Sequence, residues 1–498
     1  MELQTSIIDN QADFSVIDNV FPLCALAKTL EEAAEFESAM EVLQPFWAGP
    51  THRPNLSGLT KEAGAELLLR CGTLTGWLGS ARQINGAQEV AKDLLSESAS
   101  MFSRLDLIEK EAEANVDLAI CYWREGALDE SRVTLRYVLD LLGETPSEQR
   151  LRALLNSAIV ETVATRDHEA LRIYHHAVPL FEASSNHALK GKFHNSQALL
   201  LKSLGLSEGR EEYIDRALVE FAAASFHFEQ AAGHQRFQAI VENNVGFLFA
   251  SIGRFQEAHD HLTRARSLHL SVGDHGGAAG ADDTRAQAFL LEGKFVEAER
   301  TARAAVNQFQ RGGEQTHLVE AMTTHGTALA RLNDVNAART RLAEAVEIAQ
   351  NAGDPERGGI AALTLVEELG SQLGLDVVKN YYYKAESMLS NSQNRGLKTR
   401  LGECARRTLS SLVQIGNAES TQDSSIQPGF SLDAEVLRYE GSLIRQALEQ
   451  SRGSVTRAAR LLGVTHQGLA FILNGRHSDL LSIRTPVKRR RRSIIRYH

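Results

Sequence analysis

A cationic run stands near the C-terminal end of the 498-residue chain, where five lysine and arginine residues are consecutive. They are Lys488, Arg489, Arg490, Arg491 and Arg492. Mutual repulsion keeps such a run out of a folded core, and its simplest ligand is phosphate. Each neutralised phosphate contributes a slope of about −0.9 in log affinity against log salt. The run predicts a tail that binds DNA, with RNA, an anionic lipid surface or a nuclear localisation signal as alternatives.

A second candidate set consists of polar residues that lie five or six positions into the first helix of successive predicted helical pairs. They are Asp117, Asn156, Asn195, Asn243, Asn244, Asp283 and Thr323. A carboxamide offers both donors and an acceptor, so a row of them could hold the backbone of an extended peptide. The other interpretation is that these are solvated polar positions on ordinary exposed helix faces.

The polar residues of this second set lie on helical pairs that repeat every 40 residues. Residues 243–268 contain a small residue, an aromatic residue, a turn glycine, a second aromatic residue and then small or apolar residues. These are Gly246, Phe249, Gly253, Phe255, Ala258, Leu262 and Ala265. The same order recurs at offsets of 40 residues from Ala286, Gly326 and Val366. Small residues let two helices approach closely, and large apolar residues fill the groove between neighbouring pairs.

This pattern resembles the tetratricopeptide repeat, with a HEAT-like solenoid as the minority alternative. Weaker copies lie upstream, and one of them is expected to carry an inserted loop at 205–213. About seven or eight units then cover most of residues 25–405. The resemblance implies an α-solenoid whose first helices line a concave face, on which some tetratricopeptide regulators capture peptides.

Composition narrows the class of protein. Hydrophobic residues make up 43% and charged residues 23% of the chain, which is ordinary for a soluble globular protein. The sequence lacks an apolar run of about 18 residues, and its first residues lack a basic or apolar signal segment. Cys24, Cys71, Cys121 and Cys404 lie far apart, which predicts reduced, mostly buried thiols in a cytosolic protein.

Charge divides the chain into two parts. Residues 431–498 carry 13 Lys+Arg and 5 Asp+Glu, a net charge of +8, whereas the remainder carries 40 and 58, a net charge of −18. Between them, residues 417–431 lose all periodicity and are rich in Ser, Gln and Thr, which is typical of a linker. The asymmetry indicates separate tasks for the two parts, and an acidic array could also mask a basic tail.

Three short helices are predicted after the linker. Asp433 is the expected N-cap of the first, which ends near Gly453 and carries an apolar stripe. The stripe consists of Leu437, Leu443, Ile444 and Leu448. Ser454 is expected to cap the second helix, and Thr465 the third. Ala459 must be small where the third helix crosses the second, and Gly463 makes the turn between them. Val464, Leu469 and Ile472 are expected to bury the seam.

The stretch resembles the Fis-type helix-turn-helix of bacterial transcription regulators, in the segments ALEQSRGS and VTRAARLLGVT. The resemblance implies that the third helix reads bases in the major groove and that the second contacts the DNA backbone. The candidate DNA-binding residues are Arg457, Arg460, Thr465, His466, Gln467, Gly468, Phe471 and Arg476, together with the cationic run. The resemblance to Fis-type modules also implies a homodimer. An ordinary helical hairpin that caps the solenoid is the alternative.

The predicted organisation is all-α, a tetratricopeptide-like α-solenoid followed by a small three-helix helix-turn-helix domain. Its segments are an N-terminal segment over 1–24, the array over 25–416, the linker over 417–431, the helix-turn-helix over 432–477 and the basic tail over 478–498.

Nothing in the sequence predicts an enzyme, because phosphate-loop, metalloprotease and nucleophile-elbow motifs are absent. No cofactor or metal is expected, and the histidines at 175–176 and 259–261 are interpreted as surface or groove residues. We therefore expect a cytoplasmic, nucleoid-associated transcriptional regulator. Its array would bind a protein or peptide, its C-terminal part would bind double-stranded DNA, and it would not engage a membrane. The alternative is a non-catalytic scaffold or adaptor.

Overall fold

The computed structural model describes residues 20–407, except 83, 85, 232, 313, 314, 393 and 395, and residues 431–483. The described residues are helices joined by short turns, as predicted, and they belong to two compact units, Met1–Ser411 and Leu412–His498. The predicted N-terminal segment up to residue 19, the linker up to residue 430 and the cationic run at 488–492 lie outside the described residues.

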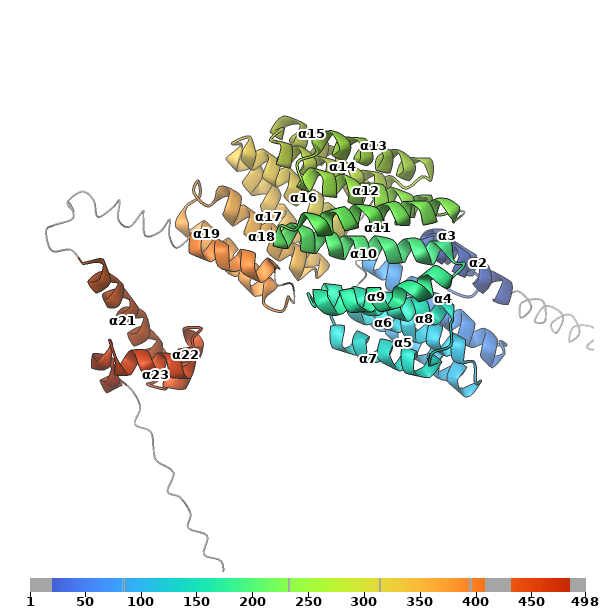
Figure 1. Ribbon diagram of the computed structural model, residues 1–498, viewed down its shortest axis with the longest axis horizontal. Coiled ribbons are helices and arrows are strands. Elements are labelled where there is room, and N and C mark those ends of the chain that lie inside the picture. Colours follow the sequence, from blue (N-terminus) through green and yellow to red (C-terminus); the bar gives the residue numbers. More distant parts are fainter. Residues whose placement is uncertain are drawn as a thin grey trace, which may run out of the picture. The chain divides into compact units, whose positions relative to one another are not determined.

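The first unit is an array of antiparallel helix pairs (Figure 1). Its helices are α2 (Val20–Glu32), α3 (Phe36–Leu43), α4 (Lys61–Arg82), α5 (Ala87–Arg104), α6 (Ile108–Arg124), α7 (Leu128–Leu142), α8 (Glu148–Val163), α9 (Asp167–Ala183), α10 (His187–Glu208), α11 (Glu211–Gln230), α12 (Gln235–Ser251), α13 (Phe255–Ser271), α14 (His275–Glu292), α15 (Phe295–Gly312), α16 (Gln315–Arg331), α17 (Val335–Ala352), α18 (Pro355–Leu369) and α19 (Leu375–Leu389). Residues 396–407 are also helical.

The small residues of the repeat lie where the two helices of a pair cross. A Cβ atom on Gly246 of α12 would be 2.7 Å from Leu262 Cγ of α13, and one on Gly326 of α16 would be 2.5 Å from Leu342 Cγ of α17. Both leucines are buried. Because glycine has no side chain, the leucine of the second helix can pack directly against the first helix, as the sequence pattern predicts.

The turn positions also follow the repeat. Gly253, Gly293 and Asn333 have φ values of +79°, +82° and +63°, in the left-handed region that glycine and asparagine adopt most easily. The prediction of an inserted loop at 205–213 is wrong. Helix α10 continues to Glu208, and Gly209, with φ +64°, ends it only two residues before α11 begins. The extra length of this repeat is therefore helix.

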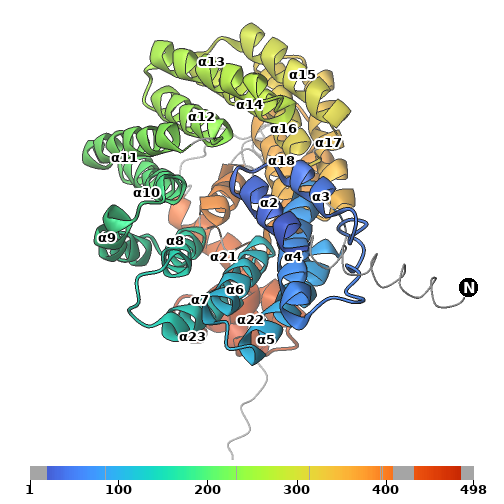
Figure 2. The same ribbon diagram turned by 90° about the vertical axis from the view of Figure 1, so that its right-hand side faces the viewer.

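Figure 2 shows that the array curves, with first helices such as α8, α10, α12 and α14 on its inner side and second helices such as α9, α11, α13 and α15 on its outer side. The curve brings distant repeats together. The Arg236 guanidinium at the start of α12 donates a 3.3 Å hydrogen bond to the carbonyl oxygen of Ala34, between α2 and α3. Helix α4 likewise contacts α16.

All four cysteines are free and buried, as predicted. Burial raises the pKa of the Cys24 and Cys121 thiols to about 12, so both stay protonated and inert. None of the described helices is long and apolar enough to cross a membrane.

The second unit contains α21 (Leu432–Gln450), α22 (Val455–Leu461), α23 (His466–Asn474) and the short 3-10 helix η1 (Ser478–Ile483). Its core consists of Ile444, Ala447, Leu448, Val455, Ala458, Ala459, Leu469, Leu473 and Leu480. Leu480 belongs to η1, so the folded part of this unit extends six residues beyond the boundary predicted at residue 477.

The helix crossings predict a contrast between two glycines on neighbouring first helices. Gly246→Ala should destabilise the array by about 1–3 kcal/mol, because its methyl group overlaps Leu262 in a packed contact. Gly280→Ala on α14, where a Cβ meets nothing within 4 Å, should stabilise it by about 0.5–1 kcal/mol through helix propensity. Thermal and urea unfolding of both variants checks this. Equal effects of the two substitutions would contradict the crossing argument.

Candidate nucleic-acid interface and repeat groove

The turn between α22 and α23 is built around two small residues. Gly463 has φ +66°, and Ala459 is 2% exposed at the point where α23 crosses α22. The backbone amide of Val464 donates a 2.9 Å hydrogen bond to the carbonyl oxygen of Ala459, which closes the turn. Leu469 is fully buried in the seam and Ile472 partly, as predicted. The prediction for Val464 is wrong, because its side chain, just after the turn, is 42% exposed.

Thr465 begins the third helix as predicted. Its Oγ1 accepts a 3.0 Å hydrogen bond from the backbone amide of Gly468, which is an N-cap interaction. A Cβ atom on Gly468 would lie 3.0 Å from that same oxygen, so a glycine here leaves room for the cap. His466 and Gln467 are exposed on the first turn, and Phe471 is 81% exposed one turn later. The start of α23 therefore presents a rigid, polar edge with one aromatic ring beside it.

The candidate arginines have different surroundings. Arg457 and Arg460 are exposed on α22. Arg476 instead donates a 2.6 Å hydrogen bond from Nη2 to Glu440 Oε1 on α21. The second oxygen of Glu440 lies 2.8 Å from His477 Nε2, whose imidazole is buried. Burial would raise the pKa of Glu440, but hydrogen bonds from His477 and Arg476 hold it below its usual value.

This bridge between α21 and the turn that follows α23 was missed by sequence analysis. Glu440 is separated from His477 by 37 positions, and nothing in the local pattern links them. One indirect signal exists in Gly441, where a Cβ atom would lie 3.0 Å from the His477 ring. The bridge closes the module and engages one of the cations expected to contact DNA.

Helix α21 differs from prediction in two respects. It already begins at Leu432, so Asp433 lies within its first turn and is not the N-cap. Its apolar stripe is only half covered, because Ile444 and Leu448 are buried whereas Leu437 and Leu443 are 40% and 41% exposed. Val436 and Tyr439 are also exposed on this helix. Ser454 is at the N-cap position of α22, but its side chain makes no capping hydrogen bond.

Three of the seven groove candidates are buried among neighbouring helices. Asp117 pairs with Arg152 and accepts a 2.8 Å hydrogen bond from Thr73 Oγ1. The Asn156 amide donates to the carbonyl oxygen of Arg152. Asp283 accepts from Gln287 Nε2 at 2.9 Å, and burial raises its pKa to about 6. Asp117 thus links α6 to α4 and α8, whereas the bond of Asn156 lies within α8.

The other four candidates are half-buried on the first helices. Asn244 Nδ2 of α12 donates a 3.0 Å hydrogen bond to Asn195 Oδ1 of α10. Asn243 Oδ1 is buried with no hydrogen-bond partner among the described residues. Thr323 Oγ1 donates to the carbonyl oxygen of Val319 one turn earlier. The structure therefore brings Asn195, Asn243 and Asn244 together at α10 and α12, and leaves the others apart.

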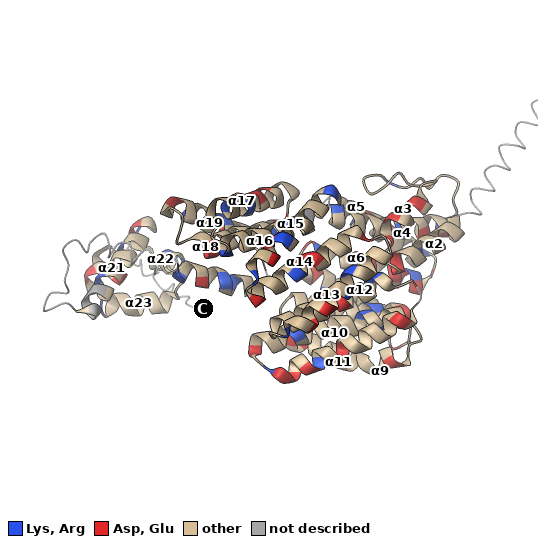
Figure 3. Ribbon diagram, turned by 90° about the horizontal axis from the view of Figure 1, so that it is seen from above, with Lys and Arg blue, Asp and Glu red and all other residues tan. Residues whose placement is uncertain are grey.

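A buried ion network among α2, α4 and α6 was also missed. Arg70 of α4 is 2% exposed and donates to Glu31 of α2 at 2.7 Å and to Glu113 of α6 at 2.6 Å. Lys28 and Lys110 lie 3.1 Å and 3.3 Å from the two oxygens of Glu113. Along the array helices generally, basic residues lie among acidic ones (Figure 3). In the network around Arg70 the basic and acidic side chains neutralise one another.

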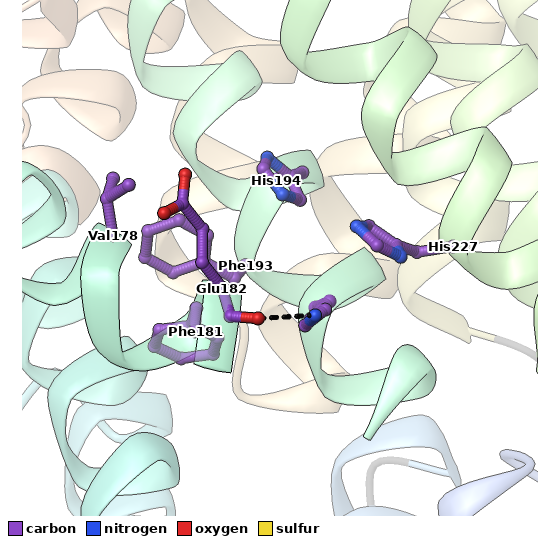
Figure 4. Close-up of a pocket in the computed structure, with 7 residues that line it drawn as sticks. Val178, Phe181, Glu182, Phe193, His194 and His227 are labelled. Atoms are coloured by element: carbon purple, nitrogen blue, oxygen red, sulfur yellow. Dashed lines mark hydrogen bonds between the residues drawn. The ribbon is translucent and has the colours of Figure 1, made fainter. Parts of the chain in front are cut away.

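A small pocket of about 120 Å³ lies between α9, α10 and α11 (Figure 4). Val178, Phe181 and Phe193 line it together with His194 and His227. The His194 ring stacks on that of His227 with centroids 5.3 Å apart, and its Nδ1 lies 2.6 Å from Glu220 Oε2. His187 Nδ1 lies 3.0 Å from His227 Nδ1. Lys190 Nζ donates a 2.9 Å hydrogen bond to the carbonyl oxygen of Glu182.

Of the histidines that sequence analysis singled out, those at 175 and 176 are exposed on α9, and those at 259 and 261 are paired with carboxylates. His259 Nε2 lies 3.0 Å from Glu292 Oε2, and His261 Nδ1 lies 2.8 Å from Glu242 Oε2. Within the described ranges, no group of three or more His, Cys, Asp or Glu residues is arranged to hold a metal ion.

The histidine pocket predicts a pH dependence. Burial, with His194, His187 and Lys190 nearby, lowers the pKa of His227 from 6.5 to about 4. The unfolded chain takes up a proton near pH 6.5 that folded His227 accepts only near pH 4. The thermal midpoint of the array should therefore fall as pH drops from about 6.5 to about 4. His227→Asn should reduce this fall, and His176→Asn, at an exposed histidine of α9, should not. An unchanged fall in His227→Asn would contradict the assignment.

Residues 438–470, from α21 into α23, match the family described as bacterial regulatory protein, Fis family. No curated protein matches the chain by sequence.

Solved structures match the helical array. Yeast Tom70 is 13% identical with a TM-score of 0.51, over 85% of this chain and 88% of Tom70. A Rap protein complexed with Competence and Sporulation Factor is 14% identical with a TM-score of 0.47, over 70% of this chain and 99% of Rap. A signal transduction ATPase with a tetratricopeptide repeat sensor from Pyrococcus horikoshii is 14% identical with a TM-score of 0.43, over 78% of this chain.

This chain spans 54%, about half, of the length of the Pyrococcus protein. The Tom70 likeness shows the fold of the array, and the family match identifies the C-terminal module. The chain is thus a tetratricopeptide-like α-solenoid followed by a Fis-type helix-turn-helix.

Proposed function

We propose that this chain is a non-catalytic transcriptional regulator that binds double-stranded DNA through its C-terminal module and receives a protein or peptide in its repeat array. The observation that carries the proposal is the Fis-type match over residues 438–470, combined with the exposed, capped start of α23. The positive charge of residues 431–498 supports it, because phosphate contacts supply much of the affinity for DNA.

In this proposal α23 enters the major groove with its N-terminal turn. Gln467 would pair with an adenine edge, and His466 would donate to a phosphate or a guanine acceptor. The exposed Phe471 ring would contact a thymine methyl group. Arg457 and Arg460 on α22 would hold phosphates and fix the orientation of the module. Arg476 would contribute only by exchanging Glu440 for a phosphate.

The exposed apolar side of α21 supports a homodimer. Val436, Leu437, Tyr439 and Leu443 are each at least 40% exposed, which is costly for a helix of a small isolated module. Association of two copies through this side would cover these residues and place two recognition helices on successive half-sites. The proposed location is the cytoplasm, at the nucleoid when DNA is bound.

The array would be the receptor half. Its first helices lie on the inner side of the curve (Figure 2), where half-buried Asn244 of α12 donates to half-buried Asn195 of α10. Such groups suit the alternating donors and acceptors of an extended backbone. A scaffold or adaptor role without DNA binding is the competing proposal, and the two DNA-binding tests below separate them.

The first test reverses the charge of α22. In the full-length protein, Arg457→Glu with Arg460→Glu should weaken binding to duplex DNA at least tenfold, because two phosphate contacts become repulsive. Fluorescence anisotropy with labelled genomic fragments measures it. The matched control is Arg172→Glu with Arg303→Glu, which changes the net charge equally at exposed positions of the array. Equal loss in both would show only a general charge effect, and binding by neither native nor variant protein would favour the scaffold.

The second test concerns the cationic run. Substituting glutamine for Arg489, Arg490, Arg491 and Arg492 should reduce the slope of log affinity against log salt by up to about 3.6, which is four phosphates at about 0.9 each. Preference among DNA sequences should stay the same, since the run reads no bases. An unchanged slope would mean that the tail does not contact DNA.

A further inference from the structure

A cleft of about 840 Å³ lies between α9 and α11, the second helices of two successive pairs. Val178 of α9 lines both this cleft and the small histidine pocket, so the two spaces adjoin (Figure 4). Sites that bind small molecules usually have volumes of about 300–1,000 Å³. The cleft is within this range, whereas the histidine pocket of about 120 Å³ is below it.

The cleft belongs to the outer side of the array. Gln197 and Asn195 are both on α10, but Gln197 lines the cleft whereas Asn195 accepts a hydrogen bond from α12. At about 100° per residue, these two side chains are about 200° apart around α10 and so lie on opposite faces of the helix. Figure 2 shows α9 and α11 on the outer side of the curve. The cleft is therefore separate from the inner face of the first helices.

Apolar side chains line both walls of the cleft. Leu171 and Val178 belong to α9, and the ring of Tyr213 belongs to α11. All three side chains are half-buried. Leu171 and Val178 are seven residues apart, which is about 10 Å along the helix at about 1.5 Å per residue. This length matches an apolar ligand body the size of a substituted naphthalene.

Gln197 supplies a polar group that has no partner. Its side chain is 6% exposed, and its Oε1 is buried without a hydrogen-bond partner among the described residues. A buried acceptor that makes no hydrogen bond destabilises a fold. A ligand that carries an O–H or N–H group satisfies this oxygen.

Two arginines line the cleft, one on each side. The Arg216 guanidinium of α11 lies 6.0 Å from the centroid of the Tyr213 ring, and no carboxylate oxygen of the described residues lies within 4.0 Å of it. Arg172 of α9 pairs with Glu169 one turn away, and its side chain is 76% exposed. Exposed pairs of this kind contribute little stability, so Arg172 can exchange its partner for a ligand. The cleft thus offers two guanidinium groups to an anion.

One carboxylate also lines the cleft and fixes the direction of the ligand. Glu220 Oε2 lies 2.6 Å from Nδ1 of His194, whose ring lines the adjoining pocket. An anionic group is repelled by this carboxylate and attracted by the two arginines, each of which lies at least one turn nearer the start of its helix. His168 and His175 of α9 line the cleft beside the arginines, and each imidazole has an N–H donor.

We propose that the outer cleft between α9 and α11 binds a small amphipathic anion. The apolar body of this ligand lies against Leu171 and Val178. Its anionic group pairs with Arg172 and Arg216, and its hydrogen-bond donor meets Gln197 Oε1. A ligand in this position contacts α9 and α11 together and so joins two successive helix pairs. The site goes beyond the proposed peptide receptor and depends neither on it nor on DNA binding.

Three matched probes test the cleft in the full-length protein. The 2,6 isomer of anilinonaphthalenesulfonate has the apolar body, an anionic group and a free N–H. N-phenyl-2-naphthylamine lacks the sulfonate, and the phenoxy analogue has an ether oxygen in place of the N–H. Fluorescence titration measures the first two, and displacement of the first measures the third. We expect the first probe to bind at least tenfold more tightly than either of the others, and more weakly as salt rises.

Substitutions locate the binding. Arg172→Met and Arg216→Met should each weaken binding of the anilino sulfonate at least fivefold and leave binding of the neutral amine unchanged. Gln197→Met should weaken binding of the anilino sulfonate at least fivefold and leave binding of the phenoxy analogue unchanged. Arg303→Met is the matched control, because it removes an exposed arginine of α15 that pairs with Glu299. Circular dichroism and thermal midpoints confirm that each variant is folded.

Equal affinity for the charged and neutral probes means adsorption to apolar surface and overturns the site. Binding that survives both arginine substitutions, or that falls as much in Arg303→Met, overturns it as well. Val178→Trp gives an independent check, because its indole fills the cleft and should abolish displaceable binding of the sulfonate probes. Unchanged binding in this variant places the probe elsewhere and rejects the proposal. Peptide and DNA binding are measured separately, so failure of the cleft leaves the proposed function standing.

Discussion

The close crossing of the two helices in each pair is the contact on which the array depends. A glycine or alanine on the first helix leaves a hollow, and a buried leucine or alanine of the second helix fills it, as Gly246 and Leu262 do. Because the two helices of a pair are close together, there is little room between them for large side chains. Large apolar residues such as Phe221 and Phe309 pack in the contacts between pairs. Repetition of one crossing with one offset produces the curvature of the array.

The C-terminal module is stabilised differently. It is too small for a large core, and its shape also depends on a glycine turn, a threonine cap and a carboxylate that joins α21 to the segment after α23. Glu440 thus adds a polar link to the apolar core. Its bond to Arg476 also means that one cation near the recognition helix is already engaged before any ligand arrives.

Much of this could be predicted from sequence, because the signals are local and repeated. Helix pairs, turn glycines and the Ala459–Gly463 turn follow from residue types at short, regular spacing. The predictions of burial failed for Val464 and Leu437, because an apolar side chain does not by itself show whether another helix covers it. Both are exposed, since the module has too few helices to cover them. Arg70 looks like an ordinary helix-surface arginine in sequence. Only the packing of α2, α4 and α6 against one another buries it between Glu31 and Glu113.

The hydrogen bond from Arg236 to the carbonyl oxygen of Ala34 has a consequence for how the array unfolds. Linear repeat proteins behave as one-dimensional chains in which each unit senses only its neighbours, so their ends fray independently. Here residues 202 positions apart in the chain are joined, and α4 touches α16. Loosening the N-terminal pair therefore also removes contacts from the middle repeats. We therefore expect the repeats that these contacts join to unfold together rather than one after another from the ends.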